Sequence, residues 1–263
     1  MIARVSLRLG VLAYLAAILL VPVGLVFWRT FEHGLHTPWA AISAPDARHA
    51  FWLTIEIALV TVPLNTVFGV LCALAIVRRR FPGKGLLNAL VDLPLALSPV
   101  VVGLALYLLY GRTGWLGPWL TSHGVQVLFA LPGMILATIF VSLPFVVREV
   151  VPVLREIGTD QEEAAATLGA GSLAIFRRVT LPAIRWAIAY GVVLTTARAL
   201  GEFGAVSVVS GRIVGKTETL TLYVQDQYES FNVTGAYAAS VLLALLAVGT
   251  LVLMTVFRPR EGS

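Results

Sequence analysis

An arginine and a glutamate four residues apart, Arg198 and Glu202, are the residues of this chain best placed to act on an anion. Both lie in a long apolar stretch, and residues four apart share one face of a helix. An intramembrane charge costs about 2.5–3.5 kcal/mol on insertion scales, so Arg198 needs a partner or a wet cavity. Two interpretations stay open: an internal ion pair that fixes helix packing, or an arginine that lines a path and offsets the charge of a divalent oxyanion. Ser98, Ser207 and Ser210 could donate their hydroxyls to the same anion, but serines in such helices more often pack or bond to the backbone.

A second charged group lies in a polar stretch of the chain, directly after Thr159. Threonine followed three residues later by Glu162 predicts a capping box, with Thr159 as the N-cap of a short helix. Asp160, Glu162 and Glu163 fall in its first turn, where the helix dipole favours negative charge. We expect this helix to end at Gly169 or at the glycine two residues later. A second short helix is then expected over Leu173–Thr180, capped by Ser172 and stopping before Pro182.

The other motifs in the sequence are weak. The segment Ser210–Thr217 approaches a phosphate-binding loop, but it lacks the first glycine and the required helix opening. His33 and His36 have a spacing that suits a metal, yet no cysteine or carboxylate completes a site, and we expect solvated loop histidines. Neither a catalytic triad nor a pair of catalytic carboxylates is evident. The sequence therefore predicts a chain that performs no chemistry itself and holds no metal.

The elements that carry these residues are expected to be membrane helices. The chain has 263 residues, 58% of them hydrophobic, and only 13% are charged, about half of the ~25% usual in soluble domains. That composition excludes an ordinary soluble enzyme, a disordered chain and a disulfide scaffold. We expect an all-α integral membrane protein, in one domain over residues 1–263. Stretches of about 20 apolar residues predict six spans: Leu9–Trp28, Phe51–Val77, Ala89–Tyr110, Val127–Val147, Ala183–Val209 and Tyr237–Phe257.

Loop charges predict the orientation of these spans. With the N-terminus inside, thirteen basic residues fall on inner segments and five on outer ones. Cytoplasmic loops carry the excess of Lys and Arg, so both ends of the chain are expected in the cytoplasm. The net charge of +5 is then explained by topology, and we expect no nucleic-acid partner.

The inner loop Arg148–Pro182 carries the most specific motif. Taken alone, its two short helices could be a solvated amphipathic hairpin. Its residues read Glu163-Ala164-Ala165, three residues, Gly169, nine residues, Val179, one residue, and then Leu181-Pro182. This pattern resembles the EAA loop of ABC-importer permeases, with valine in place of isoleucine at position 179.

The resemblance implies a coupling helix that docks into a groove of a separate ATPase subunit. The small side chains of Ala164 and Ala165 would allow close approach, and Gly169 would make the turn. Either Glu162 or Glu163 would pair with a basic residue of that ATPase. Leu181 and Pro182 complete the coupling motif.

Further segments resemble the sulfate/thiosulfate branch of that family, and most closely its CysW-type permeases. The resemblance runs from about Phe51 to Phe257 and is strongest over Ala197–Gly211. It implies a bacterial cytoplasmic-membrane permease with two ATPase subunits, a second and different permease, and an external sulfate-binding protein. ATP and magnesium would be bound by the ATPases. Other segments that carry it are Asp92–Pro94, Ser98–Val101, Tyr110–Trp119, Pro144–Glu149 and Gly215–Leu220.

Two alternatives stay open. Molybdate and tungstate permeases share the EAA loop and a similar stretch around Glu202, commonly as homodimers. A stand-alone secondary transporter or a membrane enzyme is the alternative of another class. Secondary transporters often carry inverted internal repeats, and the sequence shows no clear one.

Overall fold

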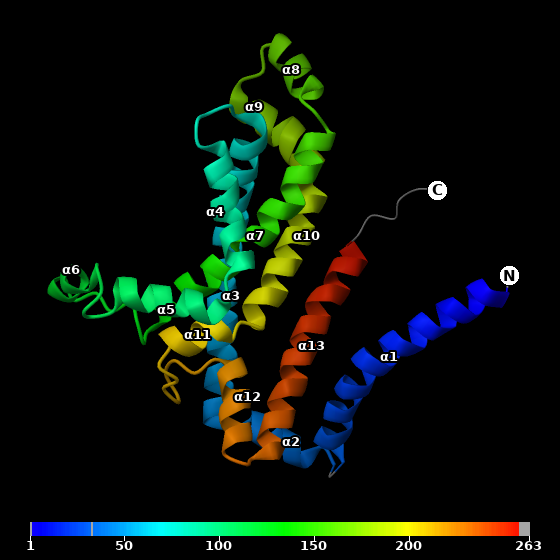
Figure 1. Cartoon of the computed structure of the whole chain (residues 1–263), viewed down its shortest axis with the longest axis vertical. Coiled ribbons are helices and arrows are strands. Elements are labelled where there is room, and N and C mark those ends of the chain that lie inside the picture. The colour runs from blue at the N-terminus through cyan, green and yellow to red at the C-terminus, as the bar shows by residue number, and fades with distance from the viewer. Residues whose placement is uncertain (1, 33, 258–263) are drawn as a thin grey trace.

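The computed structural model describes the backbone of residues 2–32 and 34–257, and these residues form helices joined by short loops (Figure 1). Side chains are described for residues 8–32 and 34–252, so His33 lies outside the described residues, as do Arg258 and Arg260, which contributed to the predicted orientation. The predicted all-α class is confirmed. In chain order the helices are α1 (Ile2–Phe31), α2 (His36–Ile42), α3 (Pro45–Arg78), α4 (Lys84–Ala96), α5 (Pro99–Tyr110), α6 (Gly117–Ser122), α7 (Leu131–Glu156), α8 (Asp160–Thr167), α9 (Ser172–Ile175), the π-helix η1 (Phe176–Thr180), α10 (Leu181–Leu200), α11 (Gly204–Val209), α12 (Leu220–Glu229) and α13 (Val233–Phe257).

Five helical segments of the described chain are long and apolar enough to cross a membrane. Four of them correspond to α1, α3, α7 and α13, and the fifth is the continuous run from α9 through α10. A sixth exists if α4 and α5, which meet at a bend of 113°, count as one broken span. The third predicted span is therefore not one straight helix.

Proline explains the break between α4 and α5. Pro99 disfavours the helical conformation in the residue before it. Leu97 and Ser98 accordingly adopt extended backbone angles, with ψ of 142° and 136°. Pro99 then begins α5, and Pro132 likewise lies in the first turn of α7, where a proline loses no helical hydrogen bond.

The fourth and fifth predicted spans also need correction. Helix α7 begins at Leu131 rather than Val127, and it continues nine residues beyond Val147 to Glu156. The fifth span was expected to run unbroken to Val209, but α10 ends at Leu200 and a short non-helical stretch separates it from α11.

Close contacts of glycine with α7 hold the centre of the bundle together. Val146 of α7 is fully buried between Gly69 of α3 and Gly191 of α10. A Cβ atom added at Gly191 would lie 2.9 Å from the Cα of Val146, and one at Gly69 would lie 2.7 Å from its Cβ. The three helices therefore approach closely only because two of them carry glycine at the crossing.

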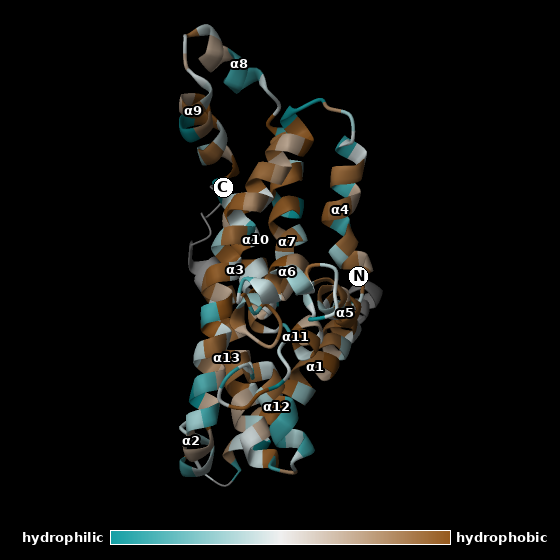
Figure 2. Ribbon diagram, turned by 90° about the vertical axis from the view of Figure 1, so that its left-hand side faces the viewer, coloured by the Kyte–Doolittle hydropathy of each residue, from teal (hydrophilic) through white to brown (hydrophobic). Residues whose placement is uncertain are grey.

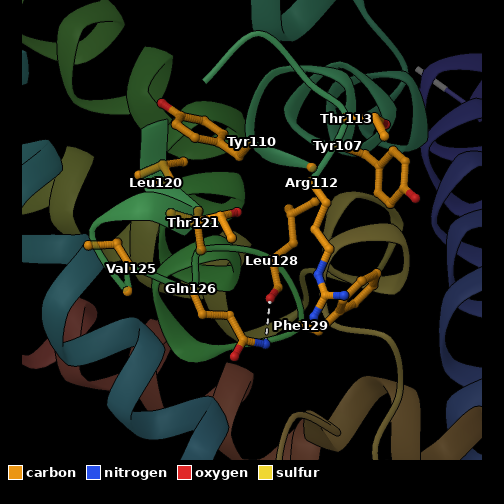
Figure 3. Close-up of a pocket in the computed structure, with 13 residues that line it drawn as sticks. Tyr107, Tyr110, Arg112, Thr113, Leu120, Thr121, Val125, Gln126, Leu128 and Phe129 are labelled. Atoms are coloured by element: carbon orange, nitrogen blue, oxygen red, sulfur yellow. Dashed lines mark hydrogen bonds between the residues drawn. The ribbon is translucent and has the colours of Figure 1, made fainter. Parts of the chain in front are cut away.

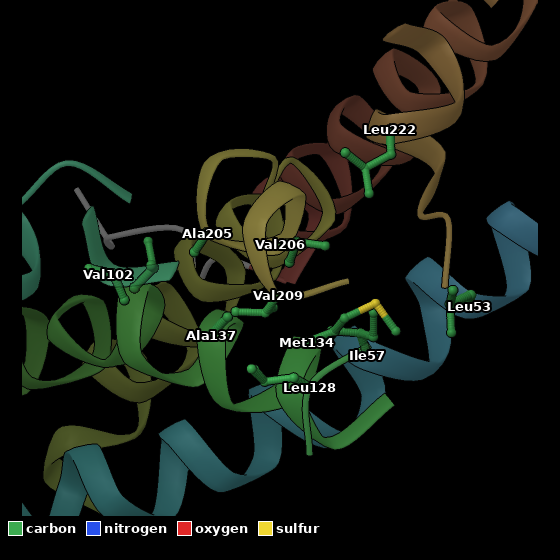
Figure 4. Close-up of a cluster of buried hydrophobic side chains, with 11 residues drawn as sticks. Leu53, Ile57, Val102, Leu128, Met134, Ala137, Ala205, Val206, Val209 and Leu222 are labelled. Atoms are coloured by element: carbon green, nitrogen blue, oxygen red, sulfur yellow. The ribbon is translucent and has the colours of Figure 1, made fainter. Parts of the chain in front are cut away.

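A second apolar cluster gathers where the broken helices meet α7 (Figure 4). Met134 of α7 is fully buried there, beside Ile57 of α3 and Leu222 of α12. Helix α11 adds Val206 and Val209, and α5 adds a valine. This cluster fixes the break after α10, and so the place of Glu202, against α3 and α7.

The polar ends of the molecule lie at the two ends of its long axis. Hydrophilic residues concentrate at α8 and around α2 and α12, with mostly apolar helices between (Figure 2). Helix α1 diverges from the bundle over most of its length (Figure 1), and none of the described residues in its most apolar stretch is buried, although Thr30 near its end is. An apolar helix of this kind needs lipid or another subunit to cover it.

Candidate functional site

The short helix α8 lies at one extreme end of the molecule (Figure 1), with Thr159 at its N-cap as predicted. Gly169 has φ of +82°, a conformation that favours glycine. Its amide donates to the carbonyl of Ala166 at 2.9 Å, and the amide of Ala170 donates to that of Ala165 at 3.1 Å. These two bonds form a Schellman motif. The predicted turn at Gly169 is confirmed.

The predicted capping box is wrong. The Thr159 hydroxyl donates to the carboxylate of Glu163 at 2.7 Å and makes no cap bond to the backbone. The carboxylate of Glu162 instead pairs with Arg78 of α3 at 3.0 Å and accepts a bond from the Thr180 hydroxyl at 2.8 Å. Pairing with Arg78 brings a full positive charge to the Glu162 carboxylate, which a backbone amide does not carry, and this explains the choice.

Helix α8 leaves most of its surface uncovered. None of its residues is buried within the described chain. Leu168, just after the helix, is 89% exposed, and Leu173, in the next turn, is 70% exposed. An isolated helix of eight residues is marginal in water, so contacts beyond its own backbone must stabilise it. The exposed surface of Ala164 and Leu168 is therefore available to another subunit.

The second predicted short helix is not separate, and Ser172 does not cap it. Gly171 is the N-cap, and a continuous helical run extends from Ser172 through Pro182 to Leu200. A proline ring clashes with the carbonyl four residues earlier in a regular α-helix. The π-helical turn Phe176–Thr180 lies immediately before Leu181-Pro182 and widens the helix there, so the chain passes the proline without stopping.

Arg198 and Glu202 form an ion pair of 2.6 Å at the break after α10. The Glu202 side chain is 2% exposed and that of Arg198 is 27% exposed. The other carboxylate oxygen of Glu202 accepts the amide of Ala205 at 2.8 Å, so Glu202 also satisfies the first turn of α11. The pair required by the packing interpretation is present, and Arg198 stays partly exposed while it is paired.

Among the described residues, no hydrogen bond links any of the three candidate serines to Arg198. Ser98 is exposed at the bend between α4 and α5. The Ser207 hydroxyl donates to the carbonyl of Gly204 at 2.8 Å. Ser210 is fully buried, and its hydroxyl accepts the amide of Arg212 at 3.2 Å. Two of the three hydroxyls are thus engaged with backbone.

The loop Ser210–Thr219 differs from a phosphate-binding loop in its geometry. The hydroxyl of Thr217 donates to the carbonyl of Ser210 at 2.6 Å, and the next helix, α12, begins only at Leu220. The same loop buries Glu218, which is 2% exposed. Burial, and after it the nearby carboxylates of Asp226 and Asp46, together raise the pKa of Glu218 from an ordinary 4.5 to about 7.

A cavity of about 520 Å³ lies beside the arm formed by α5 and α6 (Figure 3). Arg112 lines it with the phenol groups of Tyr107 and Tyr110, while the Gln126 amide donates to the carbonyl of Leu128 at 3.2 Å. None of the residues expected to contact an anion lines this cavity. The spacing of residues in the sequence did not predict this cavity, because its walls come from α5, from α6 and from the loops on either side of α6.

A model of the family described as "Binding-protein-dependent transport system inner membrane component" matches residues 65–262. The chain belongs to this family. It is therefore a multi-pass membrane protein, in agreement with its long apolar helices.

Several relatives within this family are named sulfate permeases. The chain is 52% identical over 251 residues to "Sulfate transport system permease protein CysW" of Synechocystis sp., covering 95% of this chain and 91% of the relative. It is 51% identical over 245 residues to the CysW protein of Escherichia coli (93% and 84% covered). It is 41% identical over 241 residues to "Sulfate transport system permease protein CysT" of Salmonella typhimurium (91% and 87% covered).

Solved structures with similar folds are ABC importers. A bacterial transporter described as importing the acidic polysaccharide alginate superposes with a TM-score of 0.81 at 17% identity, covering 99% of this chain and 96% of that one. A chain of the MetNI methionine transporter gives 0.58 at 20% identity, covering 78% and 91%. At these identities the likeness concerns the fold alone.

Three charged residues that matter in the structure were not singled out from the sequence. Arg78 was counted only among the charges that orient the chain, although it binds Glu162. Asp92 and Arg148 belong to two separate motif segments, and the structure joins them in an ion pair between α4 and α7. Pairs so far apart in sequence leave no spacing signal, so only the fold could reveal them.

Proposed function

We propose that this chain is the non-catalytic permease subunit of an ABC importer for sulfate or thiosulfate in a bacterial cytoplasmic membrane. The observation that carries the proposal is the exposed helix-turn of α8, closed by Gly169 and presented at one end of the bundle. The names of the CysW relatives, which cover nearly the whole chain, support the sulfate class. ATP and magnesium are then bound by a separate ATPase subunit.

In this proposal the α8 end faces the cytoplasm. Both termini lie on that side when α4 and α5 together form the third of six spans. The excess of basic residues on the inner segments supports this orientation. The loop Arg148–Pro182, which the structure folds into the end of α7, α8 and the start of the α9–α10 run, acts as the coupling element.

ATP binding closes two ATPase subunits, and α8 passes that motion to the bundle. The bundle then opens outward and accepts the anion, and hydrolysis resets it, since each ligand favours one of two states. Glu163 is the carboxylate left for a basic residue of the ATPase, because Glu162 is already paired within the chain. Ala164 and Ala165, small and only partly covered, permit the close approach.

The translocation path is proposed to pass Arg198. The ion pair with Glu202 holds Arg198 at the helix break. The Arg198 side chain is 27% exposed there and offers positive charge to an oxyanion. Ser98 is the exposed candidate hydroxyl, while Ser207 and Ser210 support the backbone of α11. Arg198→Ala should abolish sulfate uptake while the complex still assembles, and wild-type uptake in that variant would remove Arg198 from the path.

The partners follow from the same reasoning. The relatives include CysW and CysT proteins, two distinct permeases, which supports a heterodimer in which this chain takes the CysW-like place. An external sulfate-binding protein delivers the anion, and the loop Ser210–Thr217 is proposed to contact it. The alternative substrates are molybdate and tungstate, and a permease for these anions would form a homodimer.

The deciding experiment expresses the chain with its ATPase, a CysT-like permease and a binding protein in a strain unable to import sulfate. We expect uptake of labelled sulfate that requires all four components and that thiosulfate, but not molybdate, inhibits. Uptake without the ATPase would instead indicate a secondary transporter. Within the working system, Gly169→Asp should uncouple transport, since an aspartate at φ of +82° strains the turn.

A further inference from the structure

Arg78, the last residue of α3, makes contacts with three other segments of the chain. Its Nη1 donates to the carbonyl of Leu154 at 2.9 Å, and its Nη2 donates to that of Gly158 at 2.7 Å. Its Nε lies 3.0 Å from the carboxylate of Glu162. All three guanidinium nitrogens are therefore engaged, two with carbonyls at the C-terminal end of α7 and one with α8.

Glu162 completes the connection on the other side. Its carboxylate accepts the Thr180 hydroxyl at 2.8 Å, and Thr180 is 3% exposed in the π-helical turn before α10. One carboxylate of α8 thus reaches α3 through Arg78 and α10 through Thr180. We name the set Arg78, Glu162 and Thr180, with the carbonyls of Leu154 and Gly158, the Arg78 node.

The node is the main attachment of α8 to the bundle. Within the described part of the chain no residue of α8 is buried, and the Glu163 carboxylate accepts a bond from Thr159, the N-cap of its own helix. The Arg78 and Glu162 side chains are 14% and 20% exposed, so water and salt screen their pair less than a surface pair. The guanidinium also lies where the negative end of the α7 dipole favours a cation.

Arg79 and Arg80 give the contrast. They continue the same basic run but are exposed, and neither forms an ion pair among the residues whose side chains are described. Loop charge alone would make the three arginines equivalent. The structure distinguishes Arg78 from them by geometry.

We infer that Arg78 is a positioning residue for energy coupling, which ties the coupling helix to α3, α7 and α10 so that a displacement of α8 moves these helices together. The inference rests on the proposed function, because it takes α8 as the ATPase contact. It also assigns Glu162 an internal role and leaves Glu163 to the partner. Without the node, α8 can move with the ATPase while the bundle stays in place.

The test uses the complete complex, with ATPase, second permease and binding protein, reconstituted in proteoliposomes. Sulfate taken up per ATP hydrolysed is measured for wild type, Arg78→Ala, Glu162→Gln and the control Arg79→Ala. We expect Arg78→Ala to hydrolyse ATP at near the wild-type basal rate, while uptake per ATP falls by about tenfold or more, the factor for 1.4 kcal/mol. Arg79→Ala should behave as wild type.

A purely structural role predicts a different result. It would lower the amount of assembled complex but leave uptake per ATP unchanged in the complexes that form, and this outcome would overturn the inference. If the Arg78→Ala complex does not assemble, Glu162→Gln breaks the same ion pair with little change of shape. The sulfate taken up per ATP hydrolysed by the Glu162→Gln complex then decides the question. The double variant Arg78→Ala/Glu162→Gln should lose no more uptake per ATP than Arg78→Ala alone, because both substitutions break the same connection. Additive losses would contradict the inference that the two residues act together. A wild-type complex without ATP-dependent sulfate uptake would refute the proposed function instead.

Discussion

The buried carboxyl of Glu218 makes a prediction about stability and pH. Glu218 is 2% exposed, and its Oε2 has no hydrogen-bond partner among the described residues. Burial, and then the carboxylates of Asp226 and Asp46, raise its pKa from an ordinary 4.5 to about 7. The variant Glu218→Gln keeps the shape of the protonated group and removes its titration.

The sign and size of the effect follow from that shift. Between pH 4.5 and 7 the folded chain holds a proton on Glu218 that the unfolded chain releases, so stability falls as the pH rises. Each unit of pKa shift is worth 1.36 kcal/mol, and the full loss is about 3 kcal/mol by pH 8. The stabilisation that comes from protonated Glu218 is complete below pH 4.5 and absent above pH 7.

The assay is thermal unfolding of the detergent-solubilised protein from pH 5 to pH 8.5. The wild type should lose several degrees of melting temperature across this range, while Glu218→Gln should vary less and should be the more stable protein at pH 8. The control is Glu229→Gln, because Glu229 is an exposed carboxylate at the end of α12, the helix that follows the loop of Glu218. This variant should follow the wild type. An unchanged pH dependence in Glu218→Gln would refute the reasoning.

Two further predictions concern the contacts that hold the bundle together. Gly191→Ala places a methyl group 2.9 Å from the Cα of Val146, so it should destabilise the protein by about 1–3 kcal/mol in thermal unfolding; Gly249→Ala, with nothing within 4 Å, is the control and should be neutral or stabilising. Asn65 donates two hydrogen bonds from α3 to α7, and Asn65→Ala should cost about 1–3 kcal/mol by the same measurement. Thr66→Ala removes a hydroxyl that donates to the carbonyl of Val62 in its own helix, and it should cost less. Equal losses for the two variants would mean that the interhelical bonds of Asn65 contribute nothing.

The sequence alone determined the class of the protein and the location of the turn at Gly169. Apolar runs of span length have one solution in lipid, the helix, because every backbone polar group must be satisfied within the segment. Gly169 was also predictable, since the turn needs a residue that tolerates positive φ. These features depend on residues close together in the chain.

Other features were decided only by tertiary structure. The sequence placed Glu162 in a capping box, but the fold brings Arg78 and Thr180 to its carboxylate from positions 84 and 18 residues away. Prolines and glycines in the sequence marked possible breaks in the helices. Their positions alone did not show which residues lie at a 113° bend and which lie at the start of a helix. The physical reason is that a charge or a break is stabilised by whatever packs against it, and those partners come from distant segments.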